Sequence, residues 1–139
     1  MTELFGDTAY WAGLLIPNDS LHAVSVMWDN ALDKNERIVT TDLVLVEFMN
    51  HMCGLGSEAR IIAGKTWTKL SSSSSVLVIP STDGLLQKAV DLYTLADDKR
   101  WSLTDCASFI VMRERKIKDA LTYDHHFEQA GFRALLRAE

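Results

Sequence analysis

The chain has 139 residues, of which 47% are apolar, and it carries a formal net charge of −5. This length supports one hydrophobic core and is short for two independent domains, so we predict a single domain spanning residues 1–139. The apolar runs fall short of a bilayer span, and the start "MTELFGD" lacks the basic residues of a signal peptide, so we expect a cytoplasmic protein without membrane contact. The negative net charge disfavours a general nucleic-acid binder.

The first half of the chain alternates short apolar segments with longer stretches of helical periodicity. Leu21, Val24, Met27 and Trp28 recur at steps of three and four and indicate an amphipathic helix. The predicted elements are a strand at residues 3–7, helices at 8–15 and 19–34, a strand at 37–41, and helices at 42–53 and 57–70.

The second half continues this alternation after a run of serines at residues 71–75, which is too short to link domains. Strands that alternate with helices predict an α/β fold, with a short central parallel sheet of four to five strands and helices on both faces. The predicted elements are a strand at residues 76–80, helices at 82–98 and 102–116, a strand at 119–123, and an edge strand or helical turn within 132–139.

Four acidic residues lie where such a fold builds its sites, at the carboxyl ends of the strands. Asp7 follows the first predicted strand, and Asp124 follows the fourth. Glu47 interrupts the apolar run "LVLVEFM", which predicts a mostly buried carboxylate that needs a compensating partner. Asp105 begins the apolar helix "SLTDCASFIVM". We therefore expect these four acids to converge at one edge of the sheet.

Helix capping is an alternative explanation for each acid taken singly. Ser102 and Asp105 fit the pattern of a capping box. Asp7 and Asp124 could each cap the helix that follows their strand, and Glu47 could occupy a partly exposed helix position. Several carboxylates in one place repel each other, however, unless a cation neutralises them, and oxygen-rich sites suit Mg²⁺ and Mn²⁺. The set as a whole therefore predicts a Mg²⁺ site, with Mn²⁺ as a substitute.

Four motifs, "FGDT", "TTDLVLVEFMN", "LTDCASFIVM" and "TYDHHFEQAGF", follow one another in this order. Together they resemble the PIN-domain nucleases, and among them the VapC-type toxins of bacterial toxin–antitoxin pairs, over essentially the whole chain. The resemblance implies a PIN-like domain, a Mg²⁺- or Mn²⁺-dependent endoribonuclease acting on RNA such as tRNA or rRNA, a homodimer, and inhibition by a cognate antitoxin. It also implies that Asp7, Glu47, Asp105 and Asp124 are the catalytic, metal-holding residues. Two positions depart from the family pattern: Ala9 stands where many members have a serine, and Gly6 stands where a β-branched residue is common.

At such a site the four acids and two nearby hydroxyl groups would have different roles. We assign Asp124 to a second ion or a metal-bound water, and the other three acids to a shared ion. The hydroxyls of Thr8 and Thr104 could orient a ligand or a water, although for Thr104 ordinary helix-start hydrogen bonding is the preferred alternative.

His125 and His126 are adjacent, so we expect their side chains to diverge and neither of them to bind the catalytic ion. One would pack beside Phe127, and the other would face solvent or contact RNA.

The segment 99–118 carries six cations against two acids. These cations could contact an RNA backbone, or Arg113, Arg115 and Lys116 could favour the negative end of a helix dipole.

Two alternative functions remain open from the sequence. The same metal site could cleave DNA, because nothing identifies a reader of the 2′-hydroxyl group. The chain could also be a catalytically inactive PIN-fold interaction module, although the presence of all four acids disfavours this. If an antitoxin exists, we expect it to place an arginine among the acids and to contact the early helices through Trp11 and Trp28.

Overall fold

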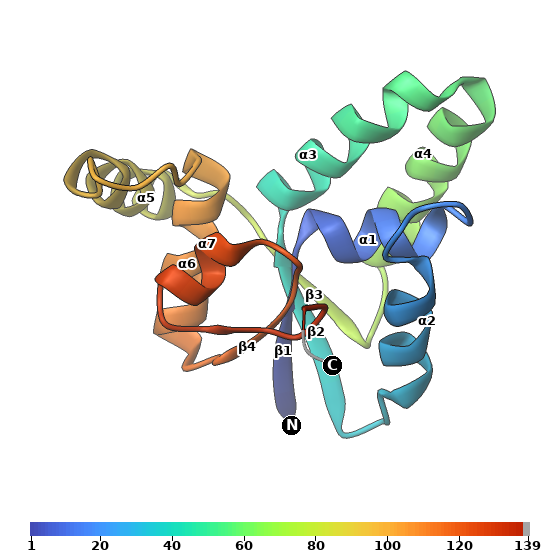
Figure 1. Ribbon diagram of the computed structural model, residues 1–139, viewed down its shortest axis with the longest axis horizontal. Coiled ribbons are helices and arrows are strands. Elements are labelled where there is room, and N and C mark those ends of the chain that lie inside the picture. The colour runs from blue at the N-terminus through green and yellow to red at the C-terminus, as the bar shows by residue number, and fades with distance from the viewer. Residues whose placement is uncertain (138–139) are drawn as a thin grey trace.

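The computed structural model describes residues 1–137, and five parallel strands form its centre in the order β3-β2-β1-β4-β5. Helices α1, α2 and α4 lie to one side of the strands, and α5, α6 and α7 lie to the other (Figure 1). The predicted α/β fold with a parallel sheet covered on both faces is confirmed. The elements are β1 (Thr2–Gly6), α1 (Thr8–Leu15), α2 (His22–Ala31), β2 (Glu36–Thr41), α3 (Asp42–Met52), the 3₁₀ turn η1 (Cys53–Leu55), α4 (Ser57–Ser71), β3 (Val76–Ile79), α5 (Asp83–Leu95), α6 (Leu103–Arg115), β4 (Asp119–Leu121), α7 (His125–Gln129) and β5 (Arg133–Ala134).

Strand β1 is the middle strand, and its register fixes where the site lies. Leu4 pairs with Ile38 of β2, and Phe5 pairs with Ala120 of β4. Phe5 and Ala120 are fully buried, as expected for a parallel sheet covered on both faces. Because β1, β2 and β4 run in the same direction, the residues that follow them meet at one edge of the sheet.

Several elements differ from the sequence expectation in their bounds, α2 most of all, and α7 was given no range from the sequence. Helix α2 is shorter than predicted, because the Leu21 N–H donates to Asp19 Oδ1 (2.8 Å) in a turn that precedes the helix. Of the two alternatives predicted for the C-terminal segment, the edge strand is the one that forms: β5 pairs with β4. Residues 138 and 139 of this segment lie outside the described residues. None of the helices within residues 1–137 is long and apolar enough to cross a membrane.

Gly6 ends β1 where there is no room for a side chain. A Cβ atom there would lie 2.8 Å from Ile38 Cγ2 and 3.0 Å from the Trp11 ring, so the indole of α1 fills the space that a β-branched residue would need. Trp11 is consequently only 3% exposed. Trp11 therefore does not lie on an exposed part of the early helices, where an antitoxin contact was expected.

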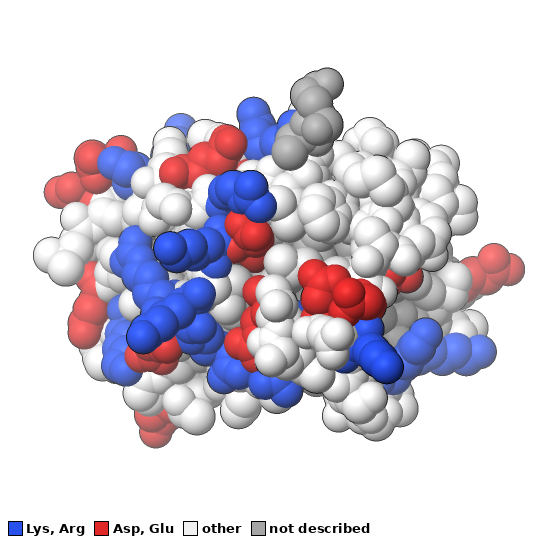
Figure 2. All heavy atoms as spheres, turned by 90° about the horizontal axis from the view of Figure 1, so that it is seen from below, with Lys and Arg blue, Asp and Glu red and all other residues white. Residues whose placement is uncertain are grey.

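The opposite end of β1 carries a cluster of charges. Glu3 accepts hydrogen bonds from Arg37 Nε (2.8 Å) and from Arg115 Nε (2.9 Å) and Nη2 (2.8 Å). Arg113 and Arg115 lie in the last turn of α6, which supports the helix-end explanation for these two cations. Figure 2, a view onto the end of the molecule where the chain begins, shows Lys and Arg gathered toward the side of α5 and α6. Arg113 and Arg115 lie at the far end of α6 from Asp105, which is in its first turn.

Candidate active site

Asp7 lies at the carboxyl end of the central strand, directly after Gly6, and is 7% exposed. It is the N-cap residue of α1, but its side chain makes no capping hydrogen bond. Instead, its Oδ2 accepts a hydrogen bond from the hydroxyl of Thr122 (2.8 Å). The same hydroxyl oxygen accepts from the Asp124 N–H (3.1 Å), so Thr122 links the first and fourth acids across β1 and β4.

The electrostatic surroundings of Asp7 disfavour its charged form. The pKa of Asp7 is raised to about 7, chiefly by burial and in smaller part by the charges of Asp105 and Glu47, against the lowering effect of hydrogen bonds from Thr122 and the Thr8 N–H. The interaction with Asp105 and Glu47 also shows that three of the predicted acids lie near each other. Asp7 is therefore a buried carboxyl group that a cation would stabilise strongly.

Glu47 projects from α3 toward the start of α1. The Thr8 hydroxyl donates to Glu47 Oε1 (2.6 Å), so it orients one of the acids that we expect to bind the ion. Glu47 is exposed, together with its neighbour Val46, whereas Val44, Leu45 and Phe48 face the core. The expectation of a mostly buried Glu47 is therefore wrong, because the apolar residues around it occupy the opposite face of α3.

Asp105 forms the capping box that its sequence suggested, and its carboxylate also contacts His126 at the site. It forms a capping box at the start of α6, in which Ser102 Oγ accepts from the Asp105 N–H (3.0 Å) and Asp105 Oδ2 accepts from the Ser102 N–H (3.1 Å). The same Oδ2 lies 3.0 Å from His126 Nδ1. Burial raises the pKa of Asp105, and the charge of Asp124 adds to this effect. Within residues 1–137 the Thr104 hydroxyl has no hydrogen bond to these acids; the Thr104 carbonyl accepts from Ser108.

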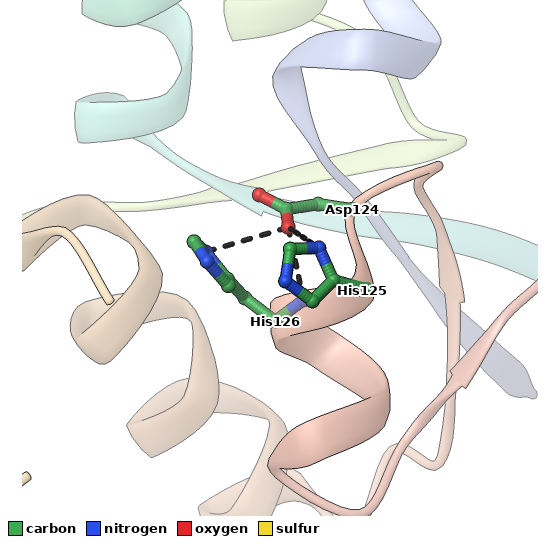
Figure 3. Close-up of side chains that lie close together, drawn as sticks. All are labelled: Asp124, His125 and His126. Atoms are coloured by element: carbon green, nitrogen blue, oxygen red, sulfur yellow. Dashed lines mark hydrogen bonds and ion pairs between the residues drawn. The ribbon is translucent and has the colours of Figure 1, made fainter. Parts of the chain in front are cut away.

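Asp124 caps α7, since its Oδ1 accepts from the His126 N–H (2.9 Å), which confirms the capping prediction for this residue. Figure 3 shows the rings of His125 and His126 turned toward its carboxylate. The ring centroids lie 4.6 Å apart, so the expected divergence of the two histidines is wrong. His125 is exposed, as expected for one of the pair, but His126 faces Asp105 and Asp124 instead of packing only beside Phe127.

A cleft of about 350 Å³ opens over these residues. Three of the four predicted acids line it, and Asp105 adjoins it through His126 and Asp124. The side chains that line the cleft include those of Asp7, Thr8, Asp19, Glu47, His51 and Asp124.

Sequence reasoning missed two polar residues at this site, Thr122 and Asp19, and it considered His126 without placing it against the acids; His51 also lines the cleft. A signal for Thr122 was present, because a hydroxyl at the end of the buried strand "DALT" is unusual unless it has a partner. His51 shares a helical stripe with Glu47, four residues earlier. The positions of Asp19 and His126 depend on the conformation of a turn and a helix start, which periodicity does not determine.

The donor set of the cleft fits a hard divalent cation. The predicted ligands are carboxylates from four separate segments, and at least two of them, Asp7 and Asp105, have pKa values raised by burial. A cation among them would offset both the burial and the mutual repulsion. Which of the four acids bind metal stays a prediction.

Comparison with known sequences gives related proteins of nearly equal length. The 23S rRNA-specific endonuclease VapC20 of Mycobacterium tuberculosis is 30% identical over 133 residues, covering 93% of this chain and 95% of the relative, with the same figures for its counterpart in a second strain. No protein-family model matches the chain.

Comparison with solved structures agrees with the sequence result. The crystal structure of M. tuberculosis VapC20, described as a sarcin–ricin loop cleaving toxin, superposes with a TM-score of 0.83 at 27% identity, covering 94% of this chain and 96% of that one. FitAcB from Neisseria gonorrhoeae superposes with a TM-score of 0.63 at 14% identity over 92% of each chain, which shows a shared fold.

Proposed function

Because the chain belongs to the VapC family of PIN-domain nuclease toxins, we propose that it is a divalent-metal-dependent endoribonuclease that cleaves ribosomal RNA and inhibits growth. The observation that carries this proposal is the placement of Asp7, a buried carboxyl group with a pKa of about 7, in a cleft shared with Glu47 and Asp124. A purely structural acid is normally paired, whereas this one is destabilised unless a cation binds.

In this proposal Asp7, Glu47 and Asp105 hold a Mg²⁺ or Mn²⁺ ion, and Asp124 holds a second ion or a water. A bound divalent ion supplies an activated water and stabilises charge on the phosphate. The chain's own contribution is orientation: Thr122 fixes the Asp7 carboxylate and Thr8 fixes Glu47 through hydroxyl hydrogen bonds. No side chain has to act as the nucleophile.

The substrate proposal is tested by incubating the protein with purified ribosomes in Mg²⁺, in Mn²⁺ or in EDTA, and mapping new RNA ends by primer extension. We expect a discrete cut in ribosomal RNA that EDTA and Asp105→Asn each abolish. Parallel reactions with bulk tRNA and with single-stranded DNA test the other substrates. Cleavage of tRNA or DNA alone would overturn the rRNA assignment, and the absence of cleavage with every substrate and ion would favour an inactive interaction module.

We also propose that a cognate antitoxin covers the site. Helices α3 and α4 leave an apolar groove of about 420 Å³ lined by Val46, Met49, Asn50, Gly64 and Trp67, and α3 also carries Glu47. A segment seated in this groove would obtain its affinity from apolar contact and could extend an arginine to the acids, where a bidentate pair would replace the cation.

This inhibition can be tested by co-expressing the adjacent small gene and purifying any complex. Trp67→Ser should weaken the complex, and replacing the antitoxin's arginines one at a time should restore RNA cleavage. Cleavage that stays blocked after every arginine is replaced would mean that steric covering alone is responsible. Sedimentation of the isolated toxin tests the homodimer proposed for it.

A further inference from the structure

The start of α7 brings two imidazole rings to the rim of the acid cleft (Figure 3). His126 Nδ1 lies 3.3 Å from Asp124 Oδ1, and His125 Nδ1 lies 3.6 Å from the same oxygen. His126 Nδ1 also lies 3.0 Å from Asp105 Oδ2. One ligand atom from each of Asp124, His125 and His126 falls within 4.8 Å of the others.

These separations match the spacing of ligands around one small cation. Bonds of about 2.0–2.2 Å from zinc to nitrogen or oxygen put neighbouring ligand atoms about 3.3–3.6 Å apart in a tetrahedral site. The 3.3 and 3.6 Å separations around Asp124 Oδ1 lie in this range. Each imidazole nitrogen therefore lies at about the ligand spacing from the shared carboxylate oxygen, and the three ligand atoms all fall within 4.8 Å of one another.

The chemistry of the donors differs from that of the main cleft. Asp7 and Glu47 offer only oxygen, which suits Mg²⁺, whereas imidazole nitrogen prefers transition metals such as Zn²⁺ and Co²⁺. We propose that Asp124, His125 and His126 form a transition-metal site at the rim of the cleft, distinct in its donors from the all-oxygen position around Asp7.

The position is open to an ion from solvent. The side chain of His125 is 60% exposed and that of Asp124 is 35% exposed, while His126 at 18% forms the inner wall. Because Asp124 belongs to both positions, an ion held by the histidines competes for this acid with an ion in the main cleft. The proposed site does not depend on RNA cleavage, so its failure and the failure of the nuclease proposal are separate results.

The alternative arrangement needs no metal. A protonated His126 could simply pair with Asp105 and Asp124, and His125 could rest against it. Binding of Co²⁺ to tag-free protein separates the two, since Co²⁺ bound through nitrogen has visible absorption bands that shift when an imidazole is lost. His51, which lines the cleft but does not belong to the Asp124 group, provides a matched control.

We expect the wild-type protein to bind Co²⁺ with the absorption bands of nitrogen ligation, which Zn²⁺ removes, and both His125→Gln and His126→Gln to weaken this binding at least about tenfold, the lower range for disturbing a ligand's support. His51→Gln and Asp7→Asn should retain the bands. Since His125 is exposed, its replacement should leave the fold intact, which near-ultraviolet circular dichroism can verify. Unchanged Co²⁺ affinity in the His125→Gln/His126→Gln double variant, or binding that Asp7→Asn alone abolishes, would overturn the proposal.

Discussion

An acid lies at each end of strand β1, and the surroundings of these two acids shift their pKa values in opposite directions. At the beginning of the strand, the hydrogen bond from Arg115, together with the nearby Arg37, lowers the pKa of Glu3 to about 2. At the end of the strand, burial, with a smaller contribution from two further acids, raises the pKa of Asp7 to about 7. Glu3, whose cationic partners are in place, and Asp7, which has no cationic partner in the described structure, lie only four positions apart in the sequence.

This difference separates structural acids from functional ones. The Glu3 cluster joins β1, β2 and α6 with cations that the chain itself supplies. The Asp7 cluster gathers acids from separated segments and supplies a hydroxyl from Thr122. A folded protein retains such an unfavourable charge when an external ligand compensates for it.

The largest expected effect is on metal binding and cleavage. Asp7→Asn should remove RNA cleavage and weaken Mn²⁺ binding by at least about a hundredfold. Loss of a residue that merely supports a metal ligand costs up to about a hundredfold in affinity, and loss of a ligand itself should cost at least as much. Glu3→Gln should alter neither measurement when both proteins are folded. Calorimetric titration and the ribosome assay report the two effects; normal Mn²⁺ affinity in both Asp7→Asn and Asp105→Asn would remove the proposed site.

The second effect is on the stability of the metal-free protein. The pKa of Asp7 rises from its usual 3.8 to about 7 on folding, so the folded state binds the proton more tightly and loses stability as pH rises through this window. Asp7→Asn should therefore be more stable than wild type at pH 8 by a few kcal/mol, at about 1.4 kcal/mol per pKa unit, and the gap should close near pH 4.

Urea unfolding in EDTA between pH 4 and pH 8 measures this gap, and Glu47→Gln is the matched control. Because Glu47 is exposed, its replacement should change the stability of the metal-free protein little. A variant Asp7→Asn that is less stable than wild type at pH 8 would mean that Asp7 has a favourable structural role.

The sequence predicts the strand order only indirectly, but it predicts the convergence of the acids well. The alternation of strands and helices is enough to place Asp7 and Asp124 at the same edge, because parallel strands share their carboxyl ends. The hydroxyl that joins these two residues could not be predicted, since Thr122 reaches Asp7 only through the pairing of β1 with β4, 115 residues apart.

Glu47 and His126 show two different limits of sequence reasoning. The exposure of Glu47 was available from helical periodicity, because Val44, Leu45 and Phe48 together define the buried face of α3. The direction of His126 was not, because it depends on where α7 begins. Asp124 caps that helix and thereby turns the imidazole toward Asp105.

The third effect concerns Glu3 at the beginning of β1, where two arginines balance the carboxylate charge. Glu3→Gln should reduce the free energy of unfolding at pH 7 by about 1–3 kcal/mol, between the values for exposed and buried ion pairs. The pKa of Glu3 falls from 4.5 to about 2 on folding, so this contribution is complete above pH 4.5 and disappears as pH falls toward 2.

Urea unfolding at pH 7 and at pH 2 checks the direction of this pH dependence. The exposed pair of Arg133 with Asp119 serves as the control, and Asp119→Asn should have the smaller effect. Equal losses for Glu3→Gln at both pH values would show that shape, and not charge, accounts for the role of Glu3.

The smallest expected effect concerns the orientation of Glu47 in the cleft at the end of β1. Thr8→Val removes the hydroxyl that donates to Glu47 Oε1 while keeping a β-branched side chain, so it should lower Mn²⁺ affinity by about tenfold and leave the fold unchanged. Thr104→Val is the control, because within residues 1–137 its hydroxyl forms no hydrogen bond with the acids. Calorimetric titration of both variants decides the matter: equal affinities for Thr8→Val and wild type would show that Glu47 needs no partner, and a larger loss for Thr104→Val would transfer the orienting role to the start of α6.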